Sequence, residues 1–242
     1  MKAVLILMYN PDLKAIPSYS YNGLREVEML KQIITMSRDI LFGQIDHYKV
    51  EINNEADLQL HFSYILKRVG ELFEFGIGHH LKINLETPFK TKSILSKSDS
   101  SRSKIDITLE WYGSTSKVTT CAIELKYFLK EGLREPKNRY AVFCDLKNLE
   151  EYVQNSRQYR MGYFLMGTDN PHYVNQKTYS QGTKDFDFRH NTIYKSGTEL
   201  TYFSRNNTFK ALSLIKDYHF LWKKVSNYFF LDHFLYRTYD KP

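Results

Sequence analysis

The chain of 242 residues is long enough to enclose one full hydrophobic core, and its 42% hydrophobic and 25% charged residues are typical of an ordinary folded protein. Its 11 Gly and 6 Pro exclude a collagen-like or linker-like chain. The net charge of +7 favours a polyanionic partner without requiring one.

The two cysteines, Cys121 and Cys144, are too few for a disulfide framework, and no Cys/His spacing resembles a zinc site. The apolar run at residues 3–9 is too short for the core of a signal peptide, and no later segment approaches a membrane span. Gly-rich phosphate loops and nucleophile elbows are absent from the sequence. We therefore expect a cytoplasmic protein without a membrane partner, and neither ATP use nor acyl transfer is supported.

Two helices are predicted in the first third of the chain. Apolar residues at helical spacing indicate a helix over residues 24–41, with Gly43 as its stop. A more regular apolar stripe predicts a second helix over 54–73, with Asn54 as its N-cap.

The middle of the chain changes to the alternation that is typical of strands. We expect a strand over 80–87 that Pro88 ends, followed by a solvated Ser- and Lys-rich loop over 91–103. Strands over 104–111 and 117–128, joined by a turn at 113–116, then form a hairpin.

A helix and a buried strand follow this hairpin. Residues 130–139 are expected to be a charged loop, before a helix that contains Val142 to Val153 and a short apolar strand over 161–167. This succession predicts a parallel strand pair with a crossover helix. Residues 171–242 show weaker secondary-structure patterns, and strands are expected there near 201–203 and 218–223. We predict one α/β domain over residues 1–242, with a mixed central sheet flanked by helices and a core over about 54–168.

The most informative pattern is Asp106 on one predicted strand with Glu124 and Lys126 on the next. Since side chains alternate across a strand, Glu124 and Lys126 share a face about 7 Å apart. Two carboxylates supply the hard oxygen ligands that Mg²⁺ prefers, and a lysine can stabilise a phosphate or hold an attacking water. A surface hairpin with a polar face is the structural alternative, but the apolar neighbours of all three residues favour a functional cluster.

Asp106, seventeen intervening residues and then Glu124-Leu125-Lys126 resembles the PD-(D/E)xK nuclease superfamily. Its core is a helix, a three-stranded meander, a crossover helix and a fourth strand, and the resemblance covers about residues 54–168. It implies that Asp106 and Glu124 are metal ligands, that the Leu125 carbonyl is a further ligand, and that Lys126 is the catalytic lysine. Ile105 stands where the family motif has a proline. This difference makes the motif match less specific, but it removes no residue with a chemical role.

The resemblance also implies an acidic residue from the first core helix, and Glu55 is the candidate. Glu55 lies in line with the buried stripe of its helix, and Gln59 shares that side. A first-turn acid favoured by the helix dipole is an equal alternative, and Glu51 and Glu71 are less well placed rivals. Related nucleases carry acidic positions on the crossover helix, but for Asp145 and Glu150 we favour a solvated helix flank.

The resemblance implies a restriction-endonuclease-like fold and a Mg²⁺-dependent DNA endonuclease of the type II restriction class, with Mn²⁺ as a substitute metal. Double-stranded DNA is the expected partner, and a homodimer is a family-level inference. The lysine-bearing segment 90–104 is the best candidate for phosphate contact, because it must lie near Asp106. The aromatic-rich residues 171–242 fit packing or an interface better than base stacking. A repair, recombination or transposition nuclease, and a non-catalytic nucleic-acid-binding protein, remain alternatives; a small-molecule α/β enzyme is disfavoured because no cofactor fingerprint is present.

Overall fold

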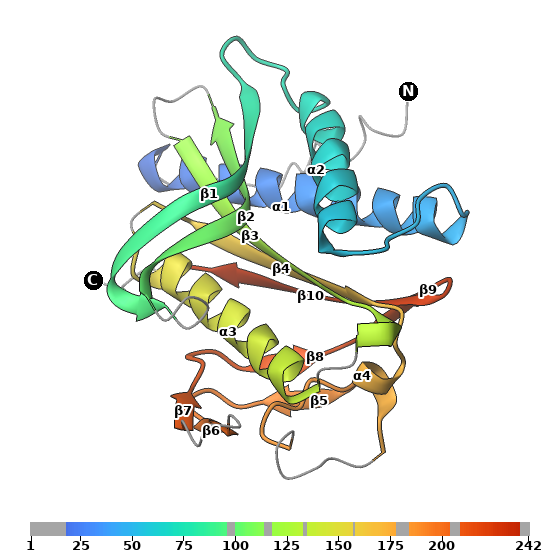
Figure 1. Cartoon of the computed structure of the whole chain (residues 1–242). Coiled ribbons are helices and arrows are strands. Elements are labelled where there is room, and N and C mark those ends of the chain that lie inside the picture. Colours follow the sequence, from blue (N-terminus) through green and yellow to red (C-terminus); the bar gives the residue numbers. More distant parts are fainter. Residues whose placement is uncertain are drawn as a thin grey trace.

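The computed structural model describes residues 18–95, 100–113, 118–132, 135–156, 158–177, 184–203 and 209–237. Within them the protein is a mixed α/β fold around a six-stranded mixed sheet of order β1-β2-β3-β4-β10-β9. Figure 1 shows α1 and α2 on one side of this sheet and α3 on the other. The elements are α1 (Ser18–Asp46), α2 (Glu55–Glu71), β1 (His80–Leu95), β2 (Ser100–Tyr112), β3 (Val118–Phe128), a 3-10 turn (Lys130–Gly132), α3 (Glu135–Gln154), β4 (Met161–Thr168), α4 (His172–Asn175), β5 (Thr192–Tyr194), β6 (Leu200–Phe203), β7 (Phe209–Leu212), β8 (Tyr218–Phe220), β9 (Lys223–Val225) and β10 (Tyr228–Tyr236).

The sheet separates two hydrophobic clusters. Because side chains alternate between the two faces of β3, this strand contributes residues to both clusters. Ile123 and Leu125 join the cluster built with α1 and α2. Ala122 and Phe128 join the cluster built with α3 and the C-terminal strands. Because β3 is central in the sheet, side chains on both of its faces are buried, which explains why apolar residues occur at both odd and even positions of the strand.

The two N-terminal helices are confirmed, with one correction. Gly43 does not stop the first helix, which runs to Asp46. A glycine inside a helix costs only about 0.5–1 kcal/mol relative to alanine, and burial of Phe42 and Ile45 beside it outweighs this cost. The predicted cap of α2 is confirmed, since the Asn54 side chain accepts a hydrogen bond from the Asp57 amide at 2.8 Å.

The prediction that Pro88 ends a strand is wrong, and so is the predicted loop over 91–103 at its described residues; residues 96–99 lie outside the described part of the chain. β1 continues to Leu95, and β2 begins at Ser100, with Pro88 opposite Lys104 and Phe89 opposite Ser103. β1 is an edge strand of the sheet, and at an edge the missing N–H of a proline removes no necessary ladder bond. Most of the expected turn at 113–116 lies outside the described residues.

The central strand pairing is confirmed. β2 and β3 are antiparallel, and β3 and β4 are parallel with α3 between them in the chain. The expected charged loop over 130–139 is wrong in its second half, because α3 already begins at Glu135.

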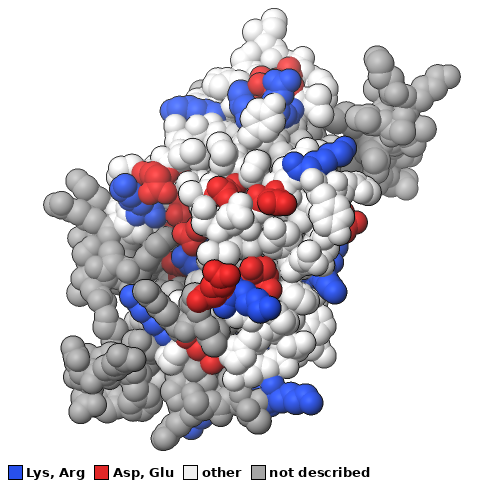
Figure 2. All heavy atoms as spheres, turned by 45° about the vertical axis from the view of Figure 1, so that its right-hand side comes forward, with Lys and Arg blue, Asp and Glu red and all other residues white. Residues whose placement is uncertain are grey.

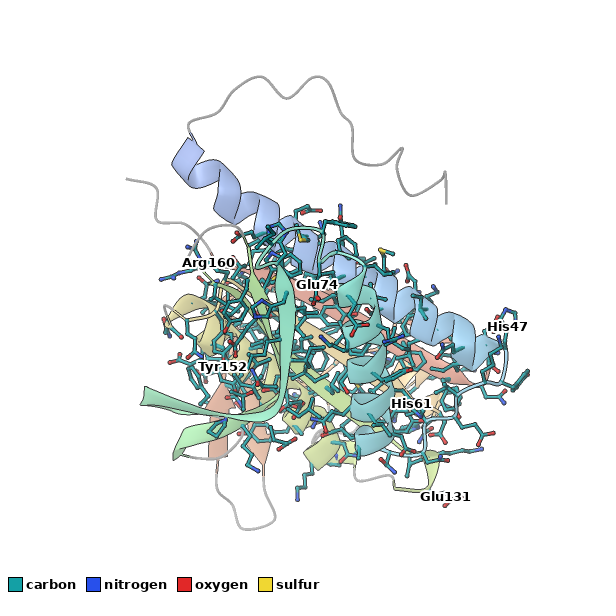
Figure 3. All side chains as sticks on the ribbon, turned by 90° about the horizontal axis from the view of Figure 1, so that it is seen from above. His47, His61, Glu74, Glu131, Tyr152 and Arg160 are labelled. Carbon is teal, nitrogen blue, oxygen red and sulfur yellow. The ribbon has the colours of Figure 1, made fainter. Side chains whose placement is uncertain are left out.

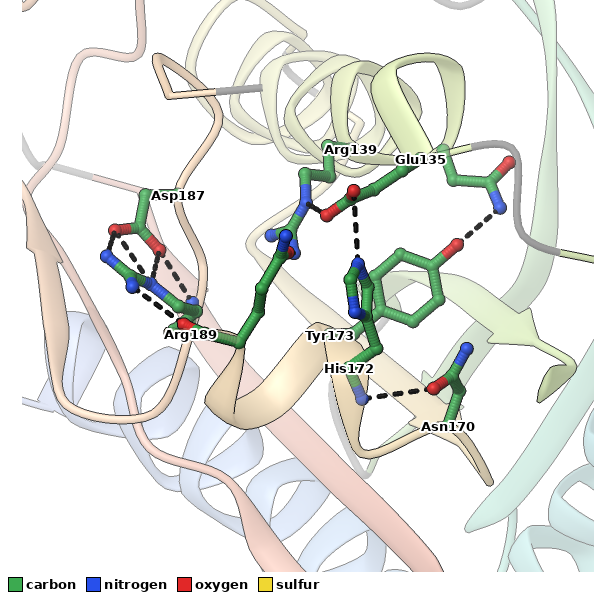
Figure 4. Close-up of polar contacts among 9 residues, drawn as sticks. Glu135, Arg139, Asn170, His172, Tyr173, Asp187 and Arg189 are labelled. Carbon is green, nitrogen blue, oxygen red and sulfur yellow. Dashed lines mark hydrogen bonds and ion pairs between the residues drawn. The ribbon is translucent and has the colours of Figure 1, made fainter. Parts of the chain in front are cut away.

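A buried arginine explains this early start of α3. Arg139 is fully buried, donates to Glu135 one turn before it at 2.6 Å, and lies over the rings of Tyr173 and Phe188. Figure 4 shows this cluster at the start of the helix, where His172 contacts the same glutamate. The long-range contacts of Arg139 therefore stabilise the first helical turn of α3, although the charged sequence of this turn is typical of a loop.

The C-terminal residues complete the sheet and cover α3. β10 pairs antiparallel with β4 from Phe229 to Tyr236, and sequence analysis did not predict it. Glu150 of α3 accepts hydrogen bonds from the amides of Ile215 and Lys216 and from the Tyr218 hydroxyl. Burial raises the pKa of Glu150, while these donors oppose that rise. None of the helices in the described part of the chain is long and apolar enough to cross a membrane.

Candidate active site

The predicted catalytic residues lie where the β2–β3 ladder ends. Paired residues run from Tyr112 opposite Val118 to Ile107 opposite Ile123. The next positions along the two strands are Asp106 and Glu124. There the Asp106 Oδ2 accepts the Leu125 amide at 2.7 Å, so a carboxylate takes the place of a strand carbonyl. Asp106 is 8% exposed and Glu124 is fully buried.

Lys126 joins three elements through its ammonium group. Its Nζ lies 3.2 Å from Glu55 Oε2 of α2 and 3.0 Å from Asp145 Oδ2 of α3. Glu55 Oε2 also accepts the Tyr127 amide at 3.3 Å. The lysine side chain is only 12% exposed, and that of Asp145 is 2% exposed, whereas Glu55 is 41% exposed. The charge of Lys126 is therefore balanced by one buried and one solvent-accessible carboxylate.

A pocket of about 260 Å³ opens beside this cluster, on the α2 side of the sheet. Gln59 of α2 spans it, because its Nε2 donates to the Asp106 carbonyl at 2.8 Å and to Glu86 Oε1 at 3.2 Å. The fully buried Glu124 is not part of the pocket wall. The wall is lined by Glu55, Ala56, Gln59, Glu86, Asp106 and Leu125.

Glu86 has an unusual backbone conformation at this point. Its φ of +52° is in the left-handed region, which costs a residue other than glycine of order 1 kcal/mol or more. The β1–β2 register pairs Leu85 with Ile107 and Thr87 with Ile105, so Glu86 is the position opposite Asp106 that the ladder skips. This irregularity brings a carboxylate of the edge strand to the pocket wall.

Two of the acidic residues were misjudged from sequence. Asp145 and Glu150 are each 1% exposed, so the expected solvated helix flank is wrong. Both lie beside the apolar stripe of α3, and only the packing of β3 and of residues 215–218 against that side reveals that it is buried. Glu86 was missed altogether, because its role depends on the β1–β2 register and leaves no local signal.

The rivals of Glu55 lie away from the cluster. Glu51 is exposed before α2 begins. Glu71 is at the other end of the 17-residue α2, about 24 Å away along the helix axis, where it pairs with Lys67 and Arg68. Of the three acids considered, only Glu55 contacts Lys126.

The donor types at this site suit a hard divalent cation. Within the described residues, no three His, Cys, Asp or Glu side chains are arranged as a metal-binding group. Mg²⁺ does not require three, since it usually binds through one or two carboxylates and keeps waters and phosphate oxygens as its remaining ligands. Asp106 and Glu124 are a set of this size by residue type and strand position, and of the two only Asp106 lines the pocket.

Burial around the site also affects Tyr127, the residue after Lys126. Burial is the main cause that raises the pKa of its hydroxyl, and the negative charge of Asp169 adds to this effect. Tyr127 therefore stays a neutral phenol and does not serve as a base.

Comparisons with known proteins add no relative: no protein-family model, no curated protein and no solved structure matches this chain.

Proposed function

We propose that this protein is a metal-dependent endonuclease with a restriction-endonuclease-like core that hydrolyses phosphodiester bonds of DNA. The observation that carries the proposal is that Lys126 of β3 lies 3.2 Å from Glu55 of α2, and that Glu55 lines an open pocket together with Asp106 of β2. The element order around them, a helix, three antiparallel strands, a helix and a parallel strand, is the order that the motif resemblance implies. A polar surface hairpin would not bury these charges.

The residues divide the work of such a reaction. Asp106 and Glu124 would hold a Mg²⁺ ion, with the Leu125 carbonyl as a further ligand and Mn²⁺ as a substitute ion. When bound, such an ion polarises a phosphoryl oxygen and lowers the pKa of a bound water. Lys126 would stabilise negative charge on the phosphate or hold the attacking water. Its contact with the half-exposed Glu55 can exchange for a phosphate oxygen, whereas the buried Asp145 keeps the ammonium in place.

A type II restriction enzyme is the subclass we favour, because the chain length suits a catalytic core with recognition elements. Double-stranded DNA is the proposed substrate, and a homodimer would place two such sites on two strands. A repair, recombination or transposition nuclease would use the same residues. A non-catalytic nucleic-acid-binding protein is less well supported, since it has no need of a lysine between two carboxylates.

The test is cleavage of plasmid DNA and of a mixture of varied sequences with Mg²⁺ or Mn²⁺. We expect metal-dependent cutting by the wild type and its loss in Asp106→Asn and Lys126→Ala. Glu55→Gln should lower both the cleavage rate and the metal affinity, because it removes a charge beside Lys126 and the pocket. Arg68→Gln, a change on the far end of α2, is the matched control and should cut normally.

The outcomes separate the alternatives. Cutting by Asp106→Asn and Lys126→Ala at the wild-type rate would remove these residues from the site. Unchanged metal affinity and rate in Glu55→Gln would return Glu55 to a helix-start role. Tight DNA binding by a wild type that cuts none of the sequences offered would favour the non-catalytic alternative.

A further inference from the structure

Asp106 occupies a strand position that neither neighbouring strand pairs. The β1–β2 register passes over it, from the pair that contains Ile107 to the pair that contains Ile105. The β2–β3 register ends at Ile107. In a regular sheet the ladder hydrogen bonds hold the backbone of a strand residue. The position of the Asp106 carboxylate therefore depends on groups outside the ladders.

Gln59 of α2 is one of these groups. Its Nε2 donates to the Asp106 carbonyl at 2.8 Å, so a side-chain amide acts where a strand amide would act in a regular ladder. From β3, the Leu125 amide donates to the Asp106 Oδ2 at 2.7 Å. Asp106 is thus held at its backbone by α2 and at its carboxylate by β3.

The packing of α2 fixes the position of the Gln59 donor. Leu58 and Phe62, one residue before Gln59 and three residues after it, are fully buried in the cluster that α2 forms with the sheet. Figure 3 shows α2 lying alongside β1, the strand that carries Glu86. A donor on a packed helix holds its acceptor more firmly than a donor on a loop.

The orientation of the Gln59 amide follows from its two neighbours. Nε2 lies 3.2 Å from Glu86 Oε1 as well as beside the Asp106 carbonyl, and an ionised carboxylate and a carbonyl can only accept hydrogen bonds. The NH₂ group must therefore face them. Glu86 is itself tied to Lys104, whose Nζ lies 3.7 Å from Glu86 Oε2. These contacts keep the amide of Gln59 turned for donation to Asp106.

We infer that Gln59 is a positioning residue, which holds Asp106 so that its carboxylate keeps one orientation at the pocket. Hydrogen bonds from outside the coordination sphere orient a metal ligand, and their loss typically costs roughly 10- to 100-fold in metal affinity or activity. Gln59 shares the pocket wall with Asp106 and acts through it rather than on the cation. This inference rests on the proposed function for the role of Asp106 as a metal ligand.

The experiment combines Mn²⁺ affinity, measured by electron paramagnetic resonance, with amide hydrogen exchange at Leu125, measured by NMR without metal. Gln59→Leu keeps the approximate side-chain size and removes the donor. Its Mn²⁺ affinity should fall roughly tenfold or more. Its Leu125 amide should exchange roughly fivefold faster or more, because the acceptor on Asp106 is held less firmly.

Gln154→Leu is the matched control. Gln154 Nε2 donates to the Tyr236 carbonyl at 3.1 Å, so the same substitution removes the same kind of bond between α3 and β10. It should leave Mn²⁺ affinity and Leu125 exchange within about twofold of the wild type, even where it lowers the unfolding free energy equally. Figure 2 shows acidic side chains interspersed with basic ones on the face it presents, and neither leucine variant changes these surface carboxylates.

An exchanged pair tests whether the bond to Asp106 or the bond to Glu86 matters. Gln59→Glu/Glu86→Gln can re-form the contact between α2 and β1 with donor and acceptor exchanged, and it leaves the charge of the pocket wall unaltered. It offers the Asp106 carbonyl no donor at position 59. We expect this variant to lose Mn²⁺ affinity and Leu125 protection as Gln59→Leu does.

Several outcomes would each overturn the inference: unchanged Leu125 exchange in Gln59→Leu, unchanged Mn²⁺ affinity in Gln59→Leu where Asp106→Asn lowers it, equal effects in Gln154→Leu, or full recovery in the exchanged pair. Failure of the proposed function gives a different result. If Asp106→Asn bound Mn²⁺ as tightly as the wild type, Asp106 would not be a ligand, and Leu125 exchange would still decide whether Gln59 holds it. Gln59-dependent Mn²⁺ binding without cleavage of DNA would reject the proposed nuclease and leave the positioning role standing.

Discussion

At the scale of single residues, the ion pair between Lys126 and Asp145 is a buried charge pair whose loss should affect stability. Both side chains are almost fully removed from water, and each balances the other's charge across β3 and α3. Breaking a buried pair from one side leaves an uncompensated charge, which is far costlier than replacing both partners by apolar groups. Glu55 differs, because its half-exposed carboxylate can be hydrated when the lysine is absent.

We therefore expect Lys126→Met to lower the free energy of unfolding by about 3–5 kcal/mol, because it takes the ammonium away from the buried Asp145. Asp145→Leu should lower it by less, because Lys126 keeps its contact with Glu55. The double variant should come within about 1 kcal/mol of the wild type, because no charge is then left buried in the pair. Urea unfolding of all four proteins measures this cycle. Simple addition of the two single losses in the double variant would show that the pair is not coupled.

Among the elements, the contact of α3 with β4 depends on a residue without a side chain. A Cβ on Gly162 of β4 would approach the Leu149 side chain to 2.8 Å and the Val153 side chain to 3.0 Å. Real Cβ atoms essentially never make non-bonded contacts this short, so the Leu149 and Val153 side chains, or the helix that carries them, would have to shift. Gly43 of α1 presents the opposite case, since nothing lies within 4 Å of its Cβ position.

Gly162→Ala should lower the free energy of unfolding by about 1–3 kcal/mol through overpacking. Gly43→Ala should raise it by about 0.5–1 kcal/mol, because alanine is the better helix former at an open helical position. Thermal and urea unfolding of the two variants form a matched pair of the same substitution. Equal shifts of the same sign would contradict the packing difference between the two sites.

For the whole molecule, His233 links stability to pH. It lies on β10 with its ring edge-on to Tyr218 and Phe220, and its Nε2 is shielded from solvent. Burial lowers the pKa of His233 to about 4, with His219 adding to the effect and Asp232 opposing it. The folded protein thus keeps this histidine neutral at a pH where the unfolded chain, with a pKa near 6.5, takes up a proton.

The contribution of His233 to stability is fully present above pH 6.5 and is lost as the pH falls toward 4. The expected loss is about 3 kcal/mol over that range. His233→Phe removes the titrating group and keeps a ring against Tyr218 and Phe220. The unfolding free energy of the wild type minus that of this variant should therefore fall between pH 7 and 4. A difference that stays constant over this range would show that His233 does not titrate as described.

Local patterns predicted the elements whose stabilising contacts are close in sequence. The N-cap of α2 needs only Asn54 and the turn that follows it. The buried strands β3 and β4 could be predicted because they are rich in apolar residues. The pairing of β2 with β3 follows from their closeness in the chain. Asp106, Glu124 and Lys126 could also be found from local sequence, because charged residues are rare in apolar strands.

Tertiary structure alone decided the rest, because each remaining feature depends on groups that are distant in sequence. The burial of Asp145 requires β3, and the place of Glu86 requires the register of β1 on β2. Sequence analysis predicted a loop over 91–103, because Pro88 and the polar residues after it are untypical of a strand. The strand pairing here is tolerated because it lies at the sheet edge and packs on Tyr152 through Phe89 and Ser103. The sequence by itself determined which residues carry the candidate chemistry; the long-range packing of the sheet determined which of them meet.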